Sequence, residues 1–136
     1  MIKILFVSEN VNQTRKFDGI FNNTTYDYYN LTDESVITEL ITRDTPDIII
    51  VDQDYENLKT LNKTIKLNCS DSIVIYLIPK DKVDKELIKY ANSFITYNMS
   101  EDLIVSTINI NLRMKNTHEM LSSFLLFRMS SLPSQL

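Results

Sequence analysis

An apolar run that leads directly into acidic residues is the part of this sequence best suited to chemistry. In PDIIIVDQD, residues 46–54, four aliphatic residues precede Asp52, and Asp54 follows two positions later. The run KILFVSEN, residues 3–10, similarly ends on Ser8 and Glu9. A carboxylate at the mouth of a buried strand can act as a nucleophile that accepts a chemical group. The plainer alternative is that Asp52 only caps its strand and accepts hydrogen bonds from backbone amides of the next loop.

Five apolar segments are predicted to form the strands that position these residues. They cover residues 2–8, 26–31, 47–52, 72–78 and 93–97. Three of them are near-continuous runs of Ile, Val, Leu and Tyr without polar alternation. Such runs are typical of strands that are covered on both faces of a parallel sheet.

Segments with helical spacing separate the predicted strands. Their predicted inward faces are Phe17, Ile20 and Phe21; Val36, Leu40 and Ile41; Leu58, Leu61 and Ile65; Val83, Leu87, Tyr90 and Ala91; and, after a cap at Ser100, Leu103, Thr107 and Ile108. Five βα units in this order predict an α/β fold with a doubly wound parallel sheet and helices on both faces. Ligands bind such sheets at the carboxyl ends of the strands. We therefore expect residues 8–10 and 52–54 to lie side by side at that edge.

The last predicted helix does not stop where a five-unit fold should be complete. Neither Gly nor Pro occurs from residue 100 to residue 132, so a helix of ~30 residues and about 45 Å is predicted. Apolar residues recur in it at spacings of seven, four and seven, as in a coiled-coil seam: Met114, Leu121, Leu125 and Leu132. The extension, residues 114–136, either folds back on its own domain, residues 1–113, or packs against another chain or a following domain.

Composition limits the classes of protein to which the chain can belong. A length of 136 residues fits one domain, and a net charge of −4 with scattered basic residues argues against a nucleic-acid-binding face. The single Cys69 excludes an internal disulfide and is expected to be a buried or half-buried thiol rather than a nucleophile. No apolar run approaches the ~20 residues of a membrane span, and the apolar N-terminus is too short for a signal peptide. We expect a cytoplasmic protein that binds neither nucleic acid nor membrane.

The composition of the chain limits which residues can form its tight turns. The sequence has one Gly and three Pro, whereas Asn is abundant. We expect tight turns to be built from Asn and Asp, which tolerate left-handed backbone geometry better than most residues.

The order and spacing of these segments resemble the receiver domain of response regulators in two-component signalling. The resemblance covers residues 1 to about 113. IKILFVSEN is similar to the family's first strand, TPDIIIVDQD to its third strand, and KELIKYANSFITYNMSEDLI to its fourth helix, fifth strand and fifth helix. The resemblance implies a five-stranded flavodoxin-like (βα)5 fold with strand order 2-1-3-4-5. It also implies a non-enzymatic signalling role, with Asp52 as the phosphoacceptor.

The same resemblance implies a Mg²⁺ site. In the family a divalent ion is held by the acceptor, by an acid after the first strand, and by a backbone carbonyl two residues after the acceptor. The matching residues are Asp52, Glu9 and Asp54, and the Asp54 carboxylate could supplement the site. The second acid of the family is replaced by Ser8. Glu9 and Asp54 are equally well explained as solvated carboxylates.

Two helper residues of the family are missing from this chain. The switch hydroxyl after the fourth strand falls at Leu77, and the lysine after the fifth strand falls at Tyr97. Without the lysine a phosphoryl group has one cation fewer to balance its charge, and Leu77 gains no contact on phosphorylation. The aromatic switch position, Phe94, fits the family. Phe94 and Tyr97 are expected to pack on the face formed by the fourth helix, fifth strand and fifth helix.

These departures predict a degenerate receiver domain that acts by association. We expect a homodimer through that face or through the C-terminal helix, with a histidine kinase or a following output domain as further partners. Residues 111–136, NLRMKNTHEMLSSFLLFRMSSLPSQL, are similar to the connector before diguanylate cyclase domains. The alternative is a working receiver whose Asp52 is phosphorylated in a Mg²⁺-dependent manner. A flavodoxin-like enzyme is disfavoured, because SENVNQT has no glycine with which to build a phosphate loop.

Overall fold

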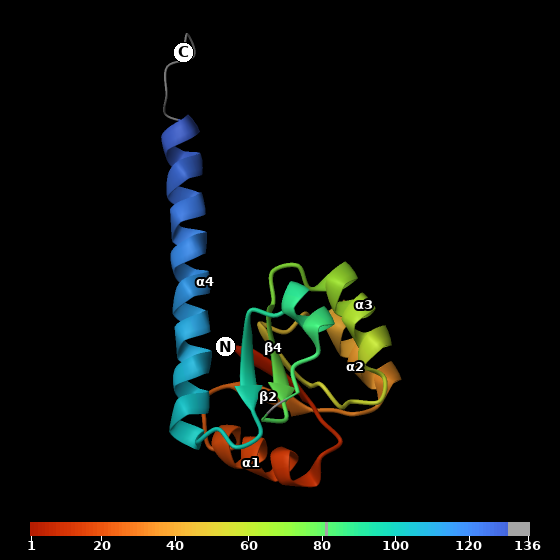
Figure 1. The fold of residues 1–136 in the computed structure, drawn as a ribbon. Coiled ribbons are helices and arrows are strands. Elements are labelled where there is room, and N and C mark those ends of the chain that lie inside the picture. The colour runs from red at the N-terminus through yellow and green to blue at the C-terminus, as the bar shows by residue number, and fades with distance from the viewer. Residues whose placement is uncertain (81, 131–136) are drawn as a thin grey trace.

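A five-stranded, fully parallel sheet forms the centre of the molecule (Figure 1). The computed structural model describes residues 1–80 and 82–130. The strands are β1 Lys3–Val7, β2 Asp27–Asn30, β3 Ile48–Asp52, β4 Ile73–Ile78 and β5 Ser93–Thr96. Their spatial order is β2-β1-β3-β4-β5, which confirms the predicted fold. Because β1 and β3 are neighbours with Val7 opposite Val51, the residues that follow them meet at one edge.

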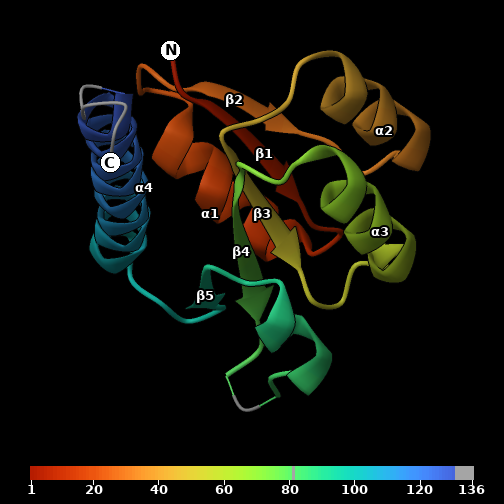
Figure 2. The ribbon, with the colours of Figure 1, turned by 90° about the horizontal axis from the view of Figure 1, so that it is seen from above.

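Helices cover both faces of this sheet (Figure 2). They are α1 Val11–Phe21, α2 Glu34–Arg43, α3 Leu58–Asn68 and α4 Glu101–Ser130, together with a 3-10 helix, η1, over Lys85–Lys89. The helices α2 and α3 lie on one face, and α1 and α4 on the other. This arrangement follows from right-handed crossovers that change winding direction beside β1.

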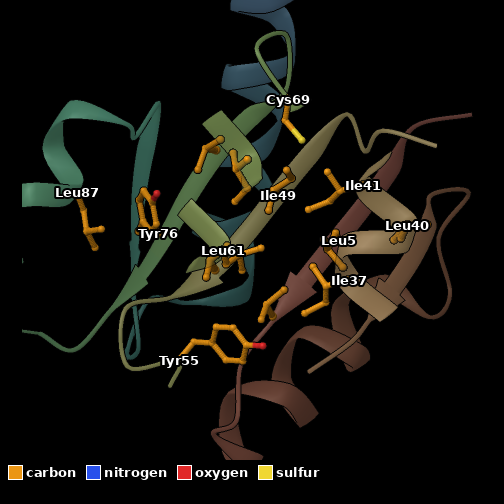
Figure 3. Close-up of a cluster of buried hydrophobic side chains, with 14 of the residues drawn as sticks. Leu5, Ile37, Leu40, Ile41, Ile49, Tyr55, Leu61, Cys69, Tyr76 and Leu87 are labelled. Carbon is orange, nitrogen blue, oxygen red and sulfur yellow. The ribbon is translucent and has the colours of Figure 1, made fainter. Parts of the chain in front are cut away.

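The alternation of side chains along the buried strands supplies two apolar layers. Leu5, Val7, Ile49 and Val51 point towards α2 and α3, in the cluster that Figure 3 shows together with the buried Cys69. The other layer, towards α1 and α4, contains the stacked rings of Phe6 and Phe17, whose centroids are 4.4 Å apart, and these four aliphatic residues: Ile4, Ile48, Ile50 and Ile75. Both faces of β1 and β3 are therefore buried, as their unbroken apolar sequences predict.

In two helices a part of the predicted inward face differs from the residues that are buried. In α2 the buried residues are Ile37, Leu40 and Ile41, whereas Val36 is exposed. In α4 Leu103 is exposed and Thr107 half-buried, whereas Ile104 and Ile108 are buried. Ser100 caps α4 by accepting a hydrogen bond from the Leu103 amide, and packing of Ile104 and Ile108 in the core layer leaves Leu103 on the outer side.

The fourth predicted helix is reduced to the single short turn η1. Asp84 caps η1 by accepting a hydrogen bond from the Glu86 amide at 3.0 Å, so Val83 lies before the helix begins. Only Leu87 is fully buried there, and Val83 and Tyr90, both predicted to face inward, are exposed. One buried residue gives too little apolar contact to hold several turns of helix.

The turns do not use left-handed backbone geometry. Among the described residues none has a positive φ, so this expectation for Asn and Asp was wrong. Asn and Asp serve as helix caps instead: Asn10 accepts from the Gln13 amide, and Asp33 accepts from the amides of Ser35 and Val36. Their side-chain oxygens satisfy helix N–H groups that have no partner within the helix.

The final helix α4 is continuous over 30 residues and extends well past the sheet (Figure 1). At 1.5 Å per residue it is about 45 Å long. It does not fold back on the domain, since Met114, Leu121 and Leu125 are all exposed. Leu132, the last residue of the predicted seam, lies outside the described residues. No helix in residues 1–80 and 82–130 combines the length and the apolar character that crossing a membrane requires.

Candidate functional site

The candidate site is centred on Asp52, the last residue of β3. Its side chain is 1% exposed and lies beside the end of β1. The Ser8 hydroxyl donates a hydrogen bond to Asp52 Oδ2 at 2.6 Å. The backbone amide of Asp54 donates to Oδ1 at 3.0 Å. The ends of β1 and β3 therefore meet at the carboxyl edge of the sheet, where the sequence places them.

The third partner of Asp52 is the phenol of Tyr97. Its hydroxyl lies 2.7 Å from Asp52 Oδ1 and 2.9 Å from Oδ2. With Ser8 and the Asp54 amide, this contact surrounds a buried carboxylate with hydrogen-bond donors from three parts of the chain. Buried charges need such partners. Tyr97 thus does more than the packing role that we expected, because its hydroxyl reaches the centre of the site.

The environment of Tyr97 keeps its hydroxyl protonated. Burial raises the pKa of Tyr97 well above its ordinary value of 10.0, and the hydrogen bond to Asp52 raises this pKa further. A phenolate beside a carboxylate would place two negative charges in contact. At neutral pH the phenol is therefore a fixed donor to Asp52.

Helix α1 holds the loop that carries Tyr97. Gln13 Nε2 and Lys16 Nζ both donate to the Tyr97 carbonyl, each at 3.1 Å. Lys16 Nζ also donates to the carbonyl of Met99. The Tyr97 amide donates to the Ile78 carbonyl at 2.9 Å. These contacts hold both the amide and the carbonyl of Tyr97. They therefore fix the position from which the phenol reaches Asp52.

Sequence reasoning missed the roles of Gln13 and Lys16. They are separated from the Tyr97 carbonyl by 84 and 81 residues, and no local pattern reports such a contact. One signal was present, because Gln13 shares a helix face with Phe17 and Phe21 at a spacing of four and is buried like them. A polar residue on an apolar face indicates a specific hydrogen bond.

The residues proposed to bind Mg²⁺ do not converge. Glu9 is exposed and its Oε1 accepts from the Glu56 amide at 2.9 Å, while Asp54 is exposed and donates its backbone amide to Asp52 Oδ1. No group of three His, Cys, Asp or Glu side chains in residues 1–80 and 82–130 is arranged to hold a metal ion. Both oxygens of Asp52 already accept hydrogen bonds. The side chains of Glu9, Asp52 and Asp54 thus form no three-carboxylate cluster, and the site that the resemblance implies, with the Asp54 carbonyl as a ligand, stays a prediction.

The two switch positions lie on opposite faces of the sheet. Leu77 pairs with Asp52 across β3 and β4, is fully buried, and packs in the layer towards α1 and α4. Phe94 is half-buried in the layer towards α2 and α3, with its ring centroid 6.3 Å from that of Tyr76. Leu77 offers the site no hydrogen-bonding side chain.

Comparison with known proteins finds similarity at the level of structure. No protein-family model and no curated protein matches the sequence. The signal receiver domain assigned to a Luxo repressor protein of Vibrio parahaemolyticus aligns with a TM-score of 0.73 at 17% identity, over 88% of this chain and 96% of that domain. The N-terminal domain of a response regulator/sensory box/GGDEF 3-domain protein of Carboxydothermus hydrogenoformans gives 0.71 at 18%, over 85% and 98%.

A longer protein contains the same fold. NtrX of Brucella abortus aligns with a TM-score of 0.78 at 17% identity, over 91% of this chain but only 29% of the NtrX chain. The chain thus spans under a third of NtrX. At these identities of 17–18% the likeness concerns the fold alone. The chain therefore has the fold of response-regulator receiver domains.

Proposed function

We propose that the chain is a degenerate receiver domain of two-component signalling, a non-enzymatic module that acts through association with other proteins. The observation that carries this proposal is the hydrogen bond from the Tyr97 hydroxyl to both oxygens of Asp52. The phenol occupies the side of the carboxylate at which an incoming phosphoryl group would need a cation. Asp52 is then a structural acceptor of hydrogen bonds rather than a phosphoacceptor.

Electrostatics support this reading of Asp52. A phosphoryl group on Asp52 would displace the phenol from a buried position and bring its charge close to the exposed carboxylates of Glu9 and Asp54. A neutral phenol offers one hydrogen bond, whereas a lysine offers a full positive charge. Leu77 adds nothing that could sense the modification. A site built in this way favours the unmodified carboxylate.

The association half of the proposal rests on the exposed apolar residues of α4. Met114, Leu121 and Leu125 project from the part of the helix that extends past the sheet. We propose that this stripe pairs with a second copy of the chain, or that a histidine kinase or an output domain contacts it or the face of η1, β5 and α4. The similarity of residues 111–136 to diguanylate cyclase connectors supports an output module of that class.

Acetyl phosphate labelling, followed by intact mass, tests the closed site. We expect no phosphoryl adduct on the wild-type chain with Mg²⁺ present, and the first adduct to appear on Tyr97→Lys, which removes the phenol and restores a cation. Tyr90→Lys, an exposed tyrosine elsewhere, is the matched control and should stay unlabelled. The adduct on Tyr97→Lys should vanish when Asp52→Asn is added.

The labelling experiment also decides the alternative function. A wild-type adduct that is lost in Asp52→Asn would show a working phosphoacceptor and overturn the closed-site proposal. Beryllofluoride with Mg²⁺ gives an independent readout, because a working site would show NMR shift changes around Asp52.

A further inference from the structure

A cleft of about 670 Å³ lies between α3 and η1, on the face of the sheet opposite α4. This volume falls in the range of about 300–1,000 Å³ that is typical of ligand sites. The cleft includes neither Asp52 nor the exposed stripe of α4. We propose that it is a docking site for an amphipathic helix of another protein, with acidic residues along one flank and basic residues along the other.

The wall formed by α3 is basic. Lys59, Lys63 and Lys66 line it at spacings of four and three, so they form a row on one side of the helix. All three are exposed, and no salt bridge to any of them is found among residues 1–80 and 82–130. Within those residues the row therefore presents three exposed positive charges that are not engaged in a salt bridge.

The opposite wall is acidic. Asp84 and Glu86 line it from η1, and Glu56 lines the cleft from the loop before α3. The α3 wall thus carries three positive formal charges and the η1 wall two negative ones, and Glu56 adds a third negative charge at the N-terminal end of α3. A phosphate-rich ligand would be attracted by one wall and repelled by the other, which disfavours nucleotides and nucleic acid.

Apolar side chains form the floor and rim of the cleft. Leu58 and Leu87 lie between the charged walls, and Tyr90 lies at the edge with its ring centroid 6.0 Å from Lys66 Nζ. Ile88 and Val83 are also exposed on the same short segment. Exposed apolar side chains that are rimmed by charges are characteristic of protein interaction sites.

Hydrogen bonds hold the cleft in a fixed shape. The Tyr76 hydroxyl donates to Asn62 Oδ1 at 2.7 Å beneath the α3 wall. On the η1 side, Gln53 Nε2 donates to the Lys82 carbonyl, and Gln53 Oε1 accepts from the Asp84 amide at 2.9 Å. Gln53 directly follows Asp52, so the end of β3 positions the acidic wall. When a site is preformed, the entropic cost of ordering it on binding is lower.

Charge complementarity identifies the occupant. A helix with acidic residues at the spacing of the lysine row, an apolar ridge, and basic residues on its other flank matches both walls and the floor. The exposed part of α4 in a second copy does not match, because residues 113–126 contain Glu119 as their single acid. The proposal therefore names a different protein as the partner. It is independent of whether Asp52 accepts phosphate.

A synthetic helical peptide is the probe for this site. It carries three Glu at spacings of four and three, a Leu ridge, and three Lys on the opposite flank. We expect saturable binding to the full chain by titration calorimetry at low salt, with NMR shift changes confined to α3 and η1. The variant Lys59→Glu/Lys63→Glu/Lys66→Glu should bind it about tenfold or more weakly, because three favourable charge contacts become repulsive.

Charge rescue makes the test specific. A peptide with its three Glu changed to Lys should bind the triple variant better than it binds the wild type. The variant Arg15→Glu/Arg113→Glu/Lys115→Glu changes the net charge equally at positions outside the cleft and should bind the first peptide like the wild type. Gln53→Ala should weaken binding several-fold, because it releases the η1 wall.

Three results would overturn the proposal. The first is failure of the peptide to bind the wild type at millimolar concentration. The second is equal weakening in both triple variants, which would mean that net charge alone drives binding. The third is self-association of the chain that the lysine variant abolishes, which would make a second copy the occupant. Circular dichroism of each variant verifies that the fold is retained.

Discussion

Tyr97 and Asp52 form a pair in which each side chain depends on the other. The carboxylate is buried and needs donors, and the phenol is partly buried and needs an acceptor. In a receiver domain with a lysine at this position, the corresponding partner carries a positive charge. Replacing that cation with a neutral donor preserves the hydrogen bond but removes the charge that would attract a phosphoryl group. On the proposal of a closed site, the chain keeps this hydrogen bond and lacks the positive charge that would favour phosphoryl transfer.

Tyr97→Phe tests the strength of this pair. Loss of a hydrogen bond to a buried charged group should lower the free energy of unfolding by about 2 kcal/mol at pH 7, measured by urea denaturation. Tyr26→Phe is the matched control, since its hydroxyl makes only an exposed 3.4 Å contact with Asn109, and it should cost under about 0.5 kcal/mol.

A double-mutant cycle with Asp52→Asn assigns the loss to the contact. If the two substitutions together cost as much as the sum of the two alone, the phenol and the carboxylate are not coupled, and the proposed closed site fails.

Alkaline pH gives a second test of the same residue. The pKa of Tyr97 is raised in the folded chain, so the folded state keeps a proton that the unfolded chain loses near pH 10. Stability should be unaffected below that pH and should fall as the pH rises above it. Burial also raises the pKa of Tyr76, to about 12, and that of Tyr28, so several groups contribute to the decline.

The part of this alkaline loss of stability that is due to Tyr97 is the difference in the free energy of unfolding between the wild type and Tyr97→Phe. Between pH 9.5 and pH 11 the variant should lose stability less steeply than the wild type, by less than about 1.4 kcal/mol per pH unit, the limit for one proton. Parallel stability curves would show that Tyr97 does not hold its proton more tightly in the folded state.

At the scale of elements, α4 shows how a single helix divides into a buried and an exposed part. Ile104, Ile108 and Asn111 are buried against the domain, and Asn111 donates to Ser93 Oγ at 2.8 Å. Ile108→Ala should therefore destabilise the fold by about 2–5 kcal/mol, whereas Ile110→Ala, two residues along and exposed, should cost under about 0.5 kcal/mol. Thermal unfolding followed by circular dichroism measures both. Equal effects would mean that α4 is rotated relative to the described orientation.

The strands could be predicted because unbroken aliphatic runs such as IIIV, bounded by polar residues, are typical of strands that are buried on both faces. Five βα units leave few topologies, and the strand order followed from the resemblance to receiver domains. The helix faces of α2 and α4 differed in part from the prediction because neighbouring residues of equal hydrophobicity, Val36 and Ile37 or Leu103 and Ile104, compete for the same side. Packing in the core layers decides between them.

The chemistry of the site could be predicted only in part. That Ser8 and Asp52 meet follows from the topology of the sheet. The orientation of Tyr97 does not, since a tyrosine after a strand can turn towards solvent, towards the core or towards a carboxylate. The orientation of Tyr97 depends on the hydrogen bonds that Gln13 and Lys16 donate to the Tyr97 carbonyl, and these bonds form only in the folded chain. η1 is likewise a tertiary result, because its sequence was compatible with a longer helix.

At the scale of the whole molecule, the exposed stripe of α4 should determine the oligomeric state. Leu121→Lys/Leu125→Lys places two charges on the stripe and should convert a dimer into a monomer at tens of micromolar, measured by light scattering coupled to size exclusion. Asn116→Lys/Ser122→Lys is the matched control, with the same added charge at exposed polar positions. It should leave the mass unchanged. A monomeric wild type at these concentrations would contradict pairing through α4.

The loop that joins the Asp52 region to α4 has a mechanical consequence. Lys16, on α1, donates a hydrogen bond to the Met99 carbonyl, only two residues before α4 begins. Helix α1 therefore holds the N-terminal end of a helix about 45 Å long. Because α4 is packed against the domain as far as Asn111, a tilt of a few degrees there would move the end at residue 130, about 28 Å away, by about 2 Å, since displacement grows in proportion to distance from the pivot. A movement as small as the departure of the Tyr97 phenol from Asp52 would in this way produce a larger displacement at the far end of α4.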